Sequence, residues 1–294
     1  MRLNKNNQSI LSDVSIIVSN ALAEDIGSGD ITCDYVLNQK TKVKAVISSK
    51  DKNVVVCGLE VIKEVFRQID RSAKVVVHVK EGSRLHSKTA ICTITGFADS
   101  ILKAERTALN FLGRLSGIAT GTRMLTDKIR KYRTRILDTR KTTPGIRVLE
   151  KYAVKIGGGS NHRCGLYDQI LIKDNHIRIL KKEYSYRSLY DIIMTAKKNA
   201  PRQTIIEIEV SSIRELEDAL KGKPDIIMLD NMNTAQMKEA VSLRNKVNKN
   251  IKLEASGNIT GKNIISVAKC GVDFISMGVL THSVKCADFS LKIK

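Results

Sequence analysis

Short apolar runs that stop at a polar residue recur through the second half of the chain and constrain its fold most strongly. The runs are RILD at Asp138, ILIKD at Lys173, IIEIEV at Glu209, IIMLD at Asp230, IKLEAS at Glu254 and VDFISMG at Ser276. Amphipathic helical patterns separate the later runs: SIRELEDALKG, NTAQMKEAVSLRNKVN and GKNIISVAKCG. Strands that alternate with helices predict a parallel sheet. Continuous apolar runs are typical of parallel strands that are buried on both faces.

Six such strands, with a seventh expected near Val154, are enough to close a barrel. The pattern alone also allows an open doubly wound sheet. In α/β barrels the chemistry lies at the C-terminal ends of the strands. Asp138 or Asp230, taken singly, could equally cap the helix that follows its strand. Six runs that end at one rim favour a functional site there.

The preceding part of the chain has a different pattern. Residues 9–26 have the apolar spacing of a helix, and residues 43–96 contain short runs rich in β-branched residues, interrupted by a helical pattern over 59–69. A long helical pattern covers residues 100–130. These features predict an α+β unit on a mainly antiparallel sheet.

Composition excludes several classes of protein. Apolar residues make up 42% and charged residues 27%, which is typical of a globular chain. No stretch of about 18 uncharged apolar residues predicts a membrane span. The N-terminal apolar stretch carries Asp13 and no small-residue cleavage pattern, so we expect a cytoplasmic protein. The six cysteines form no CxxC pair, which argues against a zinc site or a redox pair and favours scattered reduced thiols.

Fifty Lys and Arg residues against thirty Asp and Glu residues give a net charge of +20. A positive field attracts polyanions, so nucleic acid and small polyanionic substrates are both candidate partners. Aromatic residues make up only 4% and Trp is absent, which leaves few platforms for base stacking. The chain also lacks a nucleic-acid-binding signature, and its cations gather at strand ends rather than along one helix. We therefore expect no nucleic-acid partner.

The densest basic stretch runs from Leu137 to His176. Its basic residues are Arg140, Lys141, Arg147, Lys151, Lys155, His162, Arg163 and Lys173. TRKTTPG follows a strand end and predicts a loop, and GGGSNHRCGL contains three glycines that let the backbone approach a ligand. Arginine matches a carboxylate or phosphate with a planar fork, whereas lysine acts as a point charge. The mixture favours a ligand with several negative groups, against the alternative of a solvated basic face. No GxGxxG or P-loop motif is present.

Two acids and two glycine-containing segments complete the candidate site. Glu209 and Asp230 end consecutive strands and suit Mg²⁺, although they could instead orient sugar hydroxyls or neutralise nearby lysines. EASGNIT and ISMGVLTHS follow the last two strands, where barrels commonly bind phosphate. The phosphate-binding candidates are Ser256, Gly257, Asn258, Met277 and Gly278.

Several segments together resemble the quinolinate phosphoribosyltransferase family over nearly the whole chain. They are EDIGSGDIT, ERTALNFLGRLSGIAT, DTRKTTPG, KYAVKIGGGSNHRCGLYDQILIKDNH, IEIEV, LDN, EASGNIT and GVDFISMGVLTHS, in that order. The stretch from Asp138 to His176 is the most specific of them. A molybdenum-associated paralogue shares this fold, but the run of basic residues is better suited to a dicarboxylate.

The resemblance implies two domains. One is an N-terminal α+β sandwich over residues 1–112, completed by 281–294, and the other is an incomplete α/β barrel of the seven-stranded type over 113–280. It also implies a homodimer in which the N-terminal domain of one subunit covers the barrel mouth of the other, so that the active site is shared.

The resemblance further implies an activity and its residues. The family transfers phosphoribosyl from 5-phosphoribosyl 1-pyrophosphate to the ring nitrogen of quinolinate, with decarboxylation to nicotinate mononucleotide, in the biosynthesis of NAD. Its substrate-binding positions correspond to Arg106, which would reach the neighbouring subunit's site, and to Thr139, Arg140, Lys141, His162, Arg163, Lys173, Glu209 and Asp230. Its phosphate-binding positions correspond to Ser256, Gly257, Asn258, Ser276, Met277 and Gly278. Lys141, Glu209 and Asp230 are the expected catalytic residues, and Glu209 and Asp230 are the expected ligands of the Mg²⁺ cofactor.

Two positions depart from the family pattern. Asn258 stands where a second glycine is frequent, and Cys33 stands where threonine is frequent. The first affects the expected shape of the phosphate loop. A catalytically silent paralogue, kept for binding, is the remaining alternative to an enzyme.

Overall fold

The computed structural model describes residues 6–37, 41–184 and 188–294. The chain divides into two compact units. The first comprises Met1–Arg123, Thr142–Gly158 and Leu280–Lys294, and the second comprises Met124–Lys141 and Gly159–Val279. This division falls within the long helix α4 (Ala98–Ile129), as does the predicted boundary at residues 112 and 113.

The first unit is built on a four-stranded sheet that is antiparallel throughout, in the order β12-β1-β5-β3. These strands are β1 (Lys42–Ser49), β3 (Lys74–Val77), β5 (Ala90–Phe97) and β12 (Phe289–Ile293). A second, two-stranded sheet pairs β2 (Val54–Val55) with β4 (Arg84–Leu85). The helices are α1 (Asn6–Ile26), α2 (Ile31–Val36), α3 (Leu59–Ile69), most of α4, α5 (Arg147–Ile156) and α11 (Val279–His282), whose first residue belongs to the second unit. The predicted antiparallel α+β unit is confirmed.

Local sequence explains these elements. In β1, Ala45, Ile47 and Ser49 are buried at alternate positions, as the period of a strand requires. In α3, Val61, Ile62, Val65 and Phe66 form a buried stripe at helical spacing. The last strand of the chain, β12, joins this sheet beside β1.

The second unit contains a six-stranded parallel sheet in the order β6-β11-β10-β9-β8-β7. Its strands are β6 (Arg135–Leu137), β7 (Ile170–Ile172), β8 (Ile206–Val210), β9 (Ile226–Asp230), β10 (Lys252–Ser256) and β11 (Phe274–Ser276). Closing a barrel would require β6 to pair with β7, but these strands form the two edges. Beyond β6, one parallel bridge joins Leu137 to Ser160. The unit is therefore an incomplete barrel, as predicted.

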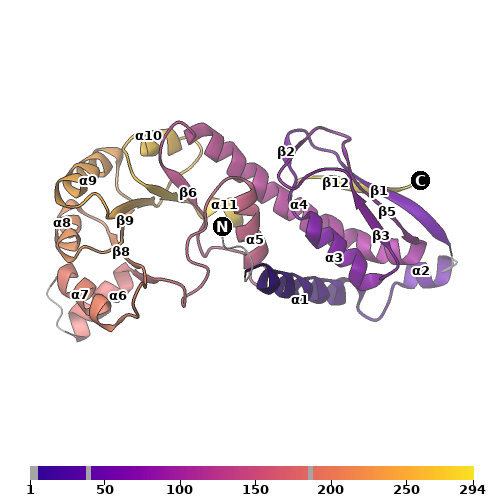
Figure 1. The fold of residues 1–294 in the computed structure, drawn as a ribbon, viewed down its shortest axis with the longest axis horizontal. Helices are drawn as coiled ribbons and strands as arrows, with labels where there is room; N and C mark the ends of the chain where they lie inside the picture. Colours follow the sequence, from indigo (N-terminus) through magenta and orange to yellow (C-terminus); the bar gives the residue numbers. More distant parts are fainter. Residues whose placement is uncertain (1–5, 38–40, 185–187) are drawn as a thin grey trace. The chain divides into compact units, whose positions relative to one another are not determined.

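Helices follow the strands of this sheet and lie along its outer side (Figure 1). They are α6 (Asp174–Glu183), α7 (Leu189–Asn199), α8 (Ile213–Gly222), α9 (Thr234–Val247) and α10 (Ile264–Ala268). Ser188, Ser212 and Asn233 cap α7, α8 and α9 by accepting hydrogen bonds from backbone N–H groups of the first turn. The caps of α8 and α9 end the loops that follow β8 and β9.

The prediction of a seventh strand near Val154 is wrong, because this residue lies in helix α5. Leu149, Ala153 and Val154 are buried at helical spacing, so their burial follows a helical period rather than a strand period. Arg147, Lys151 and Lys155 belong to the same helix at intervals of four residues. The predicted basic stretch is therefore two loops separated by a helix.

Two further expectations concern the chain as a whole. Within the described residues, no helix is long and apolar enough to cross a membrane. All six cysteines are free thiols.

Candidate active site

The register of the parallel sheet sorts its side chains onto two faces. Glu209 and Glu254 both align with Met228, and Ser256 aligns with Asp230, so these residues share one face. Because side chains alternate along a strand, Glu207 and Ser276 lie on this face too. The alternate positions form an apolar face that is buried. They include Ile208, Leu229, Leu253, Ala255 and Ile275. The acids therefore belong to the inner face of the incomplete barrel.

All six strands run in the same direction, so their C-terminal ends meet at one edge. The residues at this edge are Asp138–Lys141 after β6, Lys173 after β7, Glu209 near the end of β8, Asp230 on β9, Ser256–Asn258 on and after β10, and Ser276–Gly278 on and after β11. The fold thus brings the predicted residues of the second unit to one edge, as expected for an α/β barrel.

Lys173, Glu209 and Asp230 come from three consecutive strands and act on one another electrostatically. Burial and the negative charge of Asp230 raise the pKa of Glu209, while Lys173 opposes this rise. The three side chains therefore form an acid pair with a neighbouring cation. Two carboxylates that repel each other suit a divalent cation with oxygen ligands, so Glu209 and Asp230 fit the expected Mg²⁺.

The predicted phosphate loop is tied to this acid pair through Asn231. The Asn231 Nδ2 group donates to Asp230 Oδ2 at 2.7 Å, and Asn258 Nδ2 donates to Asn231 Oδ1 at 3.0 Å. Gly257 has a φ of +89°, and a Cβ added there would lie 2.2 Å from Asn231 Oδ1. Asn258, at a φ of 52°, adopts a left-handed conformation that asparagine tolerates. The side chain that departs from the family pattern therefore links the loop to Asp230.

The loops after β6 and before β7 are held together by Asp138 and His162. The buried Asp138 Oδ1 accepts a hydrogen bond of 2.8 Å from the backbone N–H of His162. The Arg163 side chain is buried, and its Nη1 donates to the backbone oxygen of Gln169 at 3.0 Å. Burial and the positive charge of Arg140 lower the pKa of Arg163. Arg140 and Arg163 therefore lie close enough to concentrate positive charge in these loops.

Glu150 anchors the TTPG loop that follows Lys141. The Glu150 side chain is fully buried and accepts hydrogen bonds from Arg114 Nε, Arg114 Nη2 and the backbone N–H and hydroxyl of Thr143. A buried carboxylate with four donors is well compensated. This arrangement fixes the backbone two residues after Lys141.

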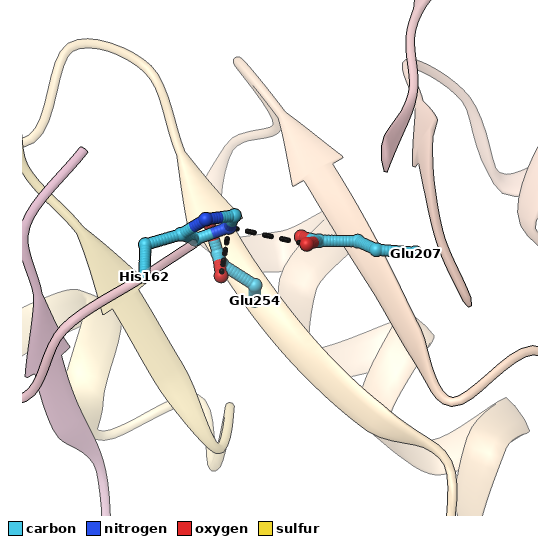
Figure 2. A group of neighbouring side chains, drawn as sticks. All are labelled: His162, Glu207 and Glu254. Atoms are coloured by element: carbon cyan, nitrogen blue, oxygen red, sulfur yellow. Dashed lines mark ion pairs between the residues drawn. The ribbon is translucent and has the colours of Figure 1, made fainter. Parts of the chain in front are cut away.

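Sequence reasoning missed Glu207 and named Glu254 only as a strand end, without placing it beside His162. Figure 2 shows the imidazole ring of His162 pointing toward Glu207 on β8 and Glu254 on β10. The His162 Nε2 atom lies 3.1 Å from Glu207 Oε2 and 3.6 Å from Glu254 Oε2. The signal for Glu207 was in the sequence IEIEV, since residues two apart on a strand share a face and Glu209 had already been placed at the site.

The remaining predicted residues have simpler surroundings. The Thr139 hydroxyl accepts a hydrogen bond from the Lys141 backbone N–H, and the Lys141 side chain is exposed. Met277 is buried and its backbone N–H donates to Leu137, while Gly278 is half-buried. Arg106 is exposed on α4 in the first unit, and its expected role in a neighbouring subunit stays a prediction.

Comparison with known proteins agrees with this geometry. Models of the quinolinate phosphoribosyl transferase N-terminal and C-terminal domains match residues 30–116 and 118–292. The chain is 41% identical to a probable nicotinate-nucleotide pyrophosphorylase [carboxylating] of Synechocystis sp., covering 92% of this chain and 90% of the relative. It is 39% identical to the protein of that name in Bacillus subtilis, covering 94% and 92%.

Solved structures show the same likeness over both units. The nicotinate-nucleotide pyrophosphorylase of Francisella tularensis superposes with a TM-score of 0.88 at 39% identity and 96% coverage of both chains. NadC of Streptococcus pyogenes superposes with a TM-score of 0.89 at 36% identity, covering 96% of this chain and 97% of that one. The chain therefore belongs to the quinolinate phosphoribosyl transferase family.

Proposed function

We propose that the protein transfers the phosphoribosyl group of 5-phosphoribosyl 1-pyrophosphate to the ring nitrogen of quinolinate and removes the 2-carboxylate as CO₂. The products are nicotinate mononucleotide and pyrophosphate. The names of the relatives, carboxylating nicotinate-nucleotide pyrophosphorylases, support this activity. It would place the protein in the de novo synthesis of NAD.

One observation carries the proposal for this chain. A cation and two acids, Lys173, Glu209 and Asp230, meet at the strand edge, and Asp230 is linked to the glycine-containing loop. The charges at this edge are complementary to a substrate pair that combines carboxylates, phosphates and a sugar. Arg140 and Arg163 add positive charge at the same edge.

The reaction needs charge placement rather than a covalent nucleophile. The pyridine nitrogen bonds to the anomeric carbon while the bond from that carbon to the pyrophosphate oxygen breaks, and pyrophosphate leaves with the electron pair. The bond from C2 to its carboxylate then breaks, its electron pair stays on C2 beside the cationic nitrogen, and C2 takes up a proton. Glu209 and Asp230 favour the positive charge that develops on the sugar, and the basic residues orient the anions.

Glu209 and Asp230 would hold Mg²⁺, because their mutual repulsion is relieved by a cation. When bound, Mg²⁺ supplies positive charge that stabilises the departing pyrophosphate. Thr139, Arg140, Lys141, His162, Arg163 and Lys173 would bind the substrates, and Ser256–Asn258 with Ser276–Gly278 would bind phosphate. We extend the proposal to a cytoplasmic homodimer in which Arg106 reaches the partner's site.

The experiment is direct. The purified protein is incubated with quinolinate, 5-phosphoribosyl 1-pyrophosphate and Mg²⁺, and CO₂ and pyrophosphate are measured over time. Equal amounts of both, with nicotinate mononucleotide, are expected. Release of pyrophosphate without CO₂, or the absence of turnover, would contradict the proposal and favour a silent paralogue.

A further inference from the structure

Three residues close a ring of contacts with the predicted substrate cation Arg163. Arg163 Nη1 donates to the Gln169 backbone oxygen at 3.0 Å, and Gln169 Nε2 donates to Glu207 Oε2 at 2.5 Å. The same Glu207 oxygen lies 3.1 Å from His162 Nε2. The His162 Nδ1 atom accepts a hydrogen bond of 2.8 Å from the Arg163 backbone N–H, which returns the path to its start. One network therefore contacts both the backbone N–H and the guanidinium of Arg163.

This network determines the tautomer of His162. A ring nitrogen that accepts from a backbone N–H carries no proton of its own, so the proton of the neutral ring is on Nε2. The Nε2–H group then faces Glu207 and Glu254 (Figure 2). The same argument disfavours a metal ion here, although one ligand atom from each of the three residues lies within 4.8 Å of the others. A metal would need the lone pair that the Nε2 proton occupies.

Glu207 and Glu254 differ in what surrounds their oxygens. Both side chains are fully buried. Glu207 Oε2 receives the amide of Gln169 and faces the His162 Nε2 proton. Among the described residues, Glu207 Oε1 and both Glu254 oxygens have no hydrogen-bond partner, so only Glu207 has one oxygen that accepts a hydrogen bond. A buried carboxylate without donors is much less stable than a buried carboxylic acid. Burial and the charge of Glu207 raise the pKa of Glu254, while His162 and the Ser276 hydroxyl oppose this rise.

We propose that Gln169, Glu207 and Glu254 are positioning residues for Arg163, acting through His162. Glu207 accepts a hydrogen bond from Gln169 and lies 3.1 Å from His162 Nε2, and Glu254 is a neutral acid that lies beside the same imidazole. The consequence for quinolinate binding rests on the proposed function, whereas the tautomer of His162 and the protonation of Glu254 do not.

The physical benefit is a rigid guanidinium. A free arginine side chain loses much rotamer entropy when it binds an anion, and a preset side chain loses less on binding. A second charged carboxylate under the ring would attract a proton to Nδ1 and convert His162 to an imidazolium, which would remove the acceptor of the Arg163 N–H. Neutral Glu254 therefore protects the contact that orients Arg163.

The first test needs no substrate. Long-range proton–nitrogen NMR spectra of the ¹⁵N-histidine-labelled full chain report which ring nitrogen carries a proton, and the His162 signals are identified by their loss in His162→Asn. We expect an unprotonated Nδ1 and a protonated Nε2 near neutral pH, in the wild type and in Glu254→Gln. An Nδ1 proton or an imidazolium in the wild type would overturn the assignment.

The second test compares two matched substitutions by steady-state kinetics. Glu254→Gln keeps a neutral group of the same shape, so we expect kinetic constants within about twofold of the wild type. Glu207→Gln gives its two donor neighbours one acceptor fewer, so we expect the KM for quinolinate to rise about tenfold or more, with the KM for the phosphoribosyl donor nearly unchanged. The exposed Glu183→Gln serves as a control for loss of a negative charge in the same unit.

Three outcomes would overturn the proposal. The first is an equal loss of kcat/KM for quinolinate in Glu254→Gln and Glu207→Gln. The second is an unchanged KM for quinolinate in Glu207→Gln. The third is an equal rise of the KM values for quinolinate and for the phosphoribosyl donor in Glu207→Gln. Should Glu207→Gln fail to fold, Gln169→Met removes one donor to Glu207 and is expected to raise the same constant by a smaller factor. A wild type without turnover would contradict the proposed function while leaving the NMR assignment of His162 intact.

Discussion

Glu209 shows how a single carboxylate acquires its properties from its neighbours. Burial and Asp230 on the next strand raise its pKa, and Lys173, which follows the preceding strand, opposes this rise. The acid itself is ordinary, and its position between two strand ends decides its chemistry. The same holds for Arg163, whose pKa is lowered by burial and by Arg140.

Arg140 and Lys141 provide a test at the scale of the residue. If their charges contact a substrate anion, replacing either with alanine should cost about 2 kcal/mol or more of transition-state binding, seen as a fall in kcat/KM. Steady-state kinetics with both substrates measures this fall. Wild-type turnover in both variants would remove these residues from the site.

Glu254 provides a second test, in the dependence of stability on pH. Its folded pKa is raised above the ordinary value of 4.5, so the folded state binds this proton more tightly than the unfolded state does. The contribution of Glu254 to the free energy of unfolding should therefore fall as pH rises from about 4.5 through the folded pKa. Glu254→Gln lacks this titration, so its stability relative to the wild type should grow with pH over that window.

Urea unfolding of both proteins at a series of pH values measures the difference. Titrating groups far from Glu254 are shared by the two proteins and cancel, so the difference reports the coupled titration of Glu254 with Glu207 and His162. Parallel stability profiles would show that Glu254 has the same affinity for a proton in the folded and unfolded states.

At the scale of the element, the loop after β10 depends on a glycine. Gly257 has a φ of +89°, and an added Cβ would meet the Asn231 side chain that is bonded to Asp230. Gly257→Ala should therefore shift this loop and raise the KM for the phosphoribosyl donor by about tenfold, since strain of this kind costs roughly 1–3 kcal/mol.

The matched control is Gly121→Ala. Gly121 lies within α4, and a Cβ added there meets no atom within 4 Å. This variant should keep its kinetic constants and gain up to about 1 kcal/mol of stability in denaturant unfolding. Equal kinetic losses in both variants would argue against a special role of the loop after β10.

Helices and strands were predicted well where their hydrophobic pattern was regular along the whole element. The helix over 59–69 and the parallel strands ending at Asp230 and Glu209 follow directly from burial on one stripe or on both faces. Val154 was misassigned because a β-branched residue in a short segment carries little information about period. Tertiary packing under α5 decided its structure.

The site was predictable to the extent that function resides at strand ends. Lys173, Glu209 and Asp230 follow from that rule alone. Glu207 is marked only by its spacing of two residues from Glu209, and Glu254 only as the acid in IKLEAS; the register then shows that both share a face with the rim. Their fully buried state depends on neighbours far away in the sequence.

At the scale of the whole molecule, Arg106 tests the expected shared site. If Arg106 acts in the partner's site, heterodimers of an Arg106→Ala subunit and a Lys173→Ala subunit should regain activity, because one of their two sites is intact. Activity of the mixed sample is compared with that of each variant alone. Absence of recovery in verified heterodimers would contradict the shared site.

The position of β12 has a consequence for the synthesis of the protein. This strand, made from residues 289–293, borders β1, made from residues 42–49. On the ribosome, that edge of β1 stays unpaired until almost all of the second unit has been translated. A strand edge with unpaired N–H and C=O groups can pair with other chains. The nascent polypeptide is thus exposed to aggregation for most of its translation, and chaperones that shield such borders should raise its yield.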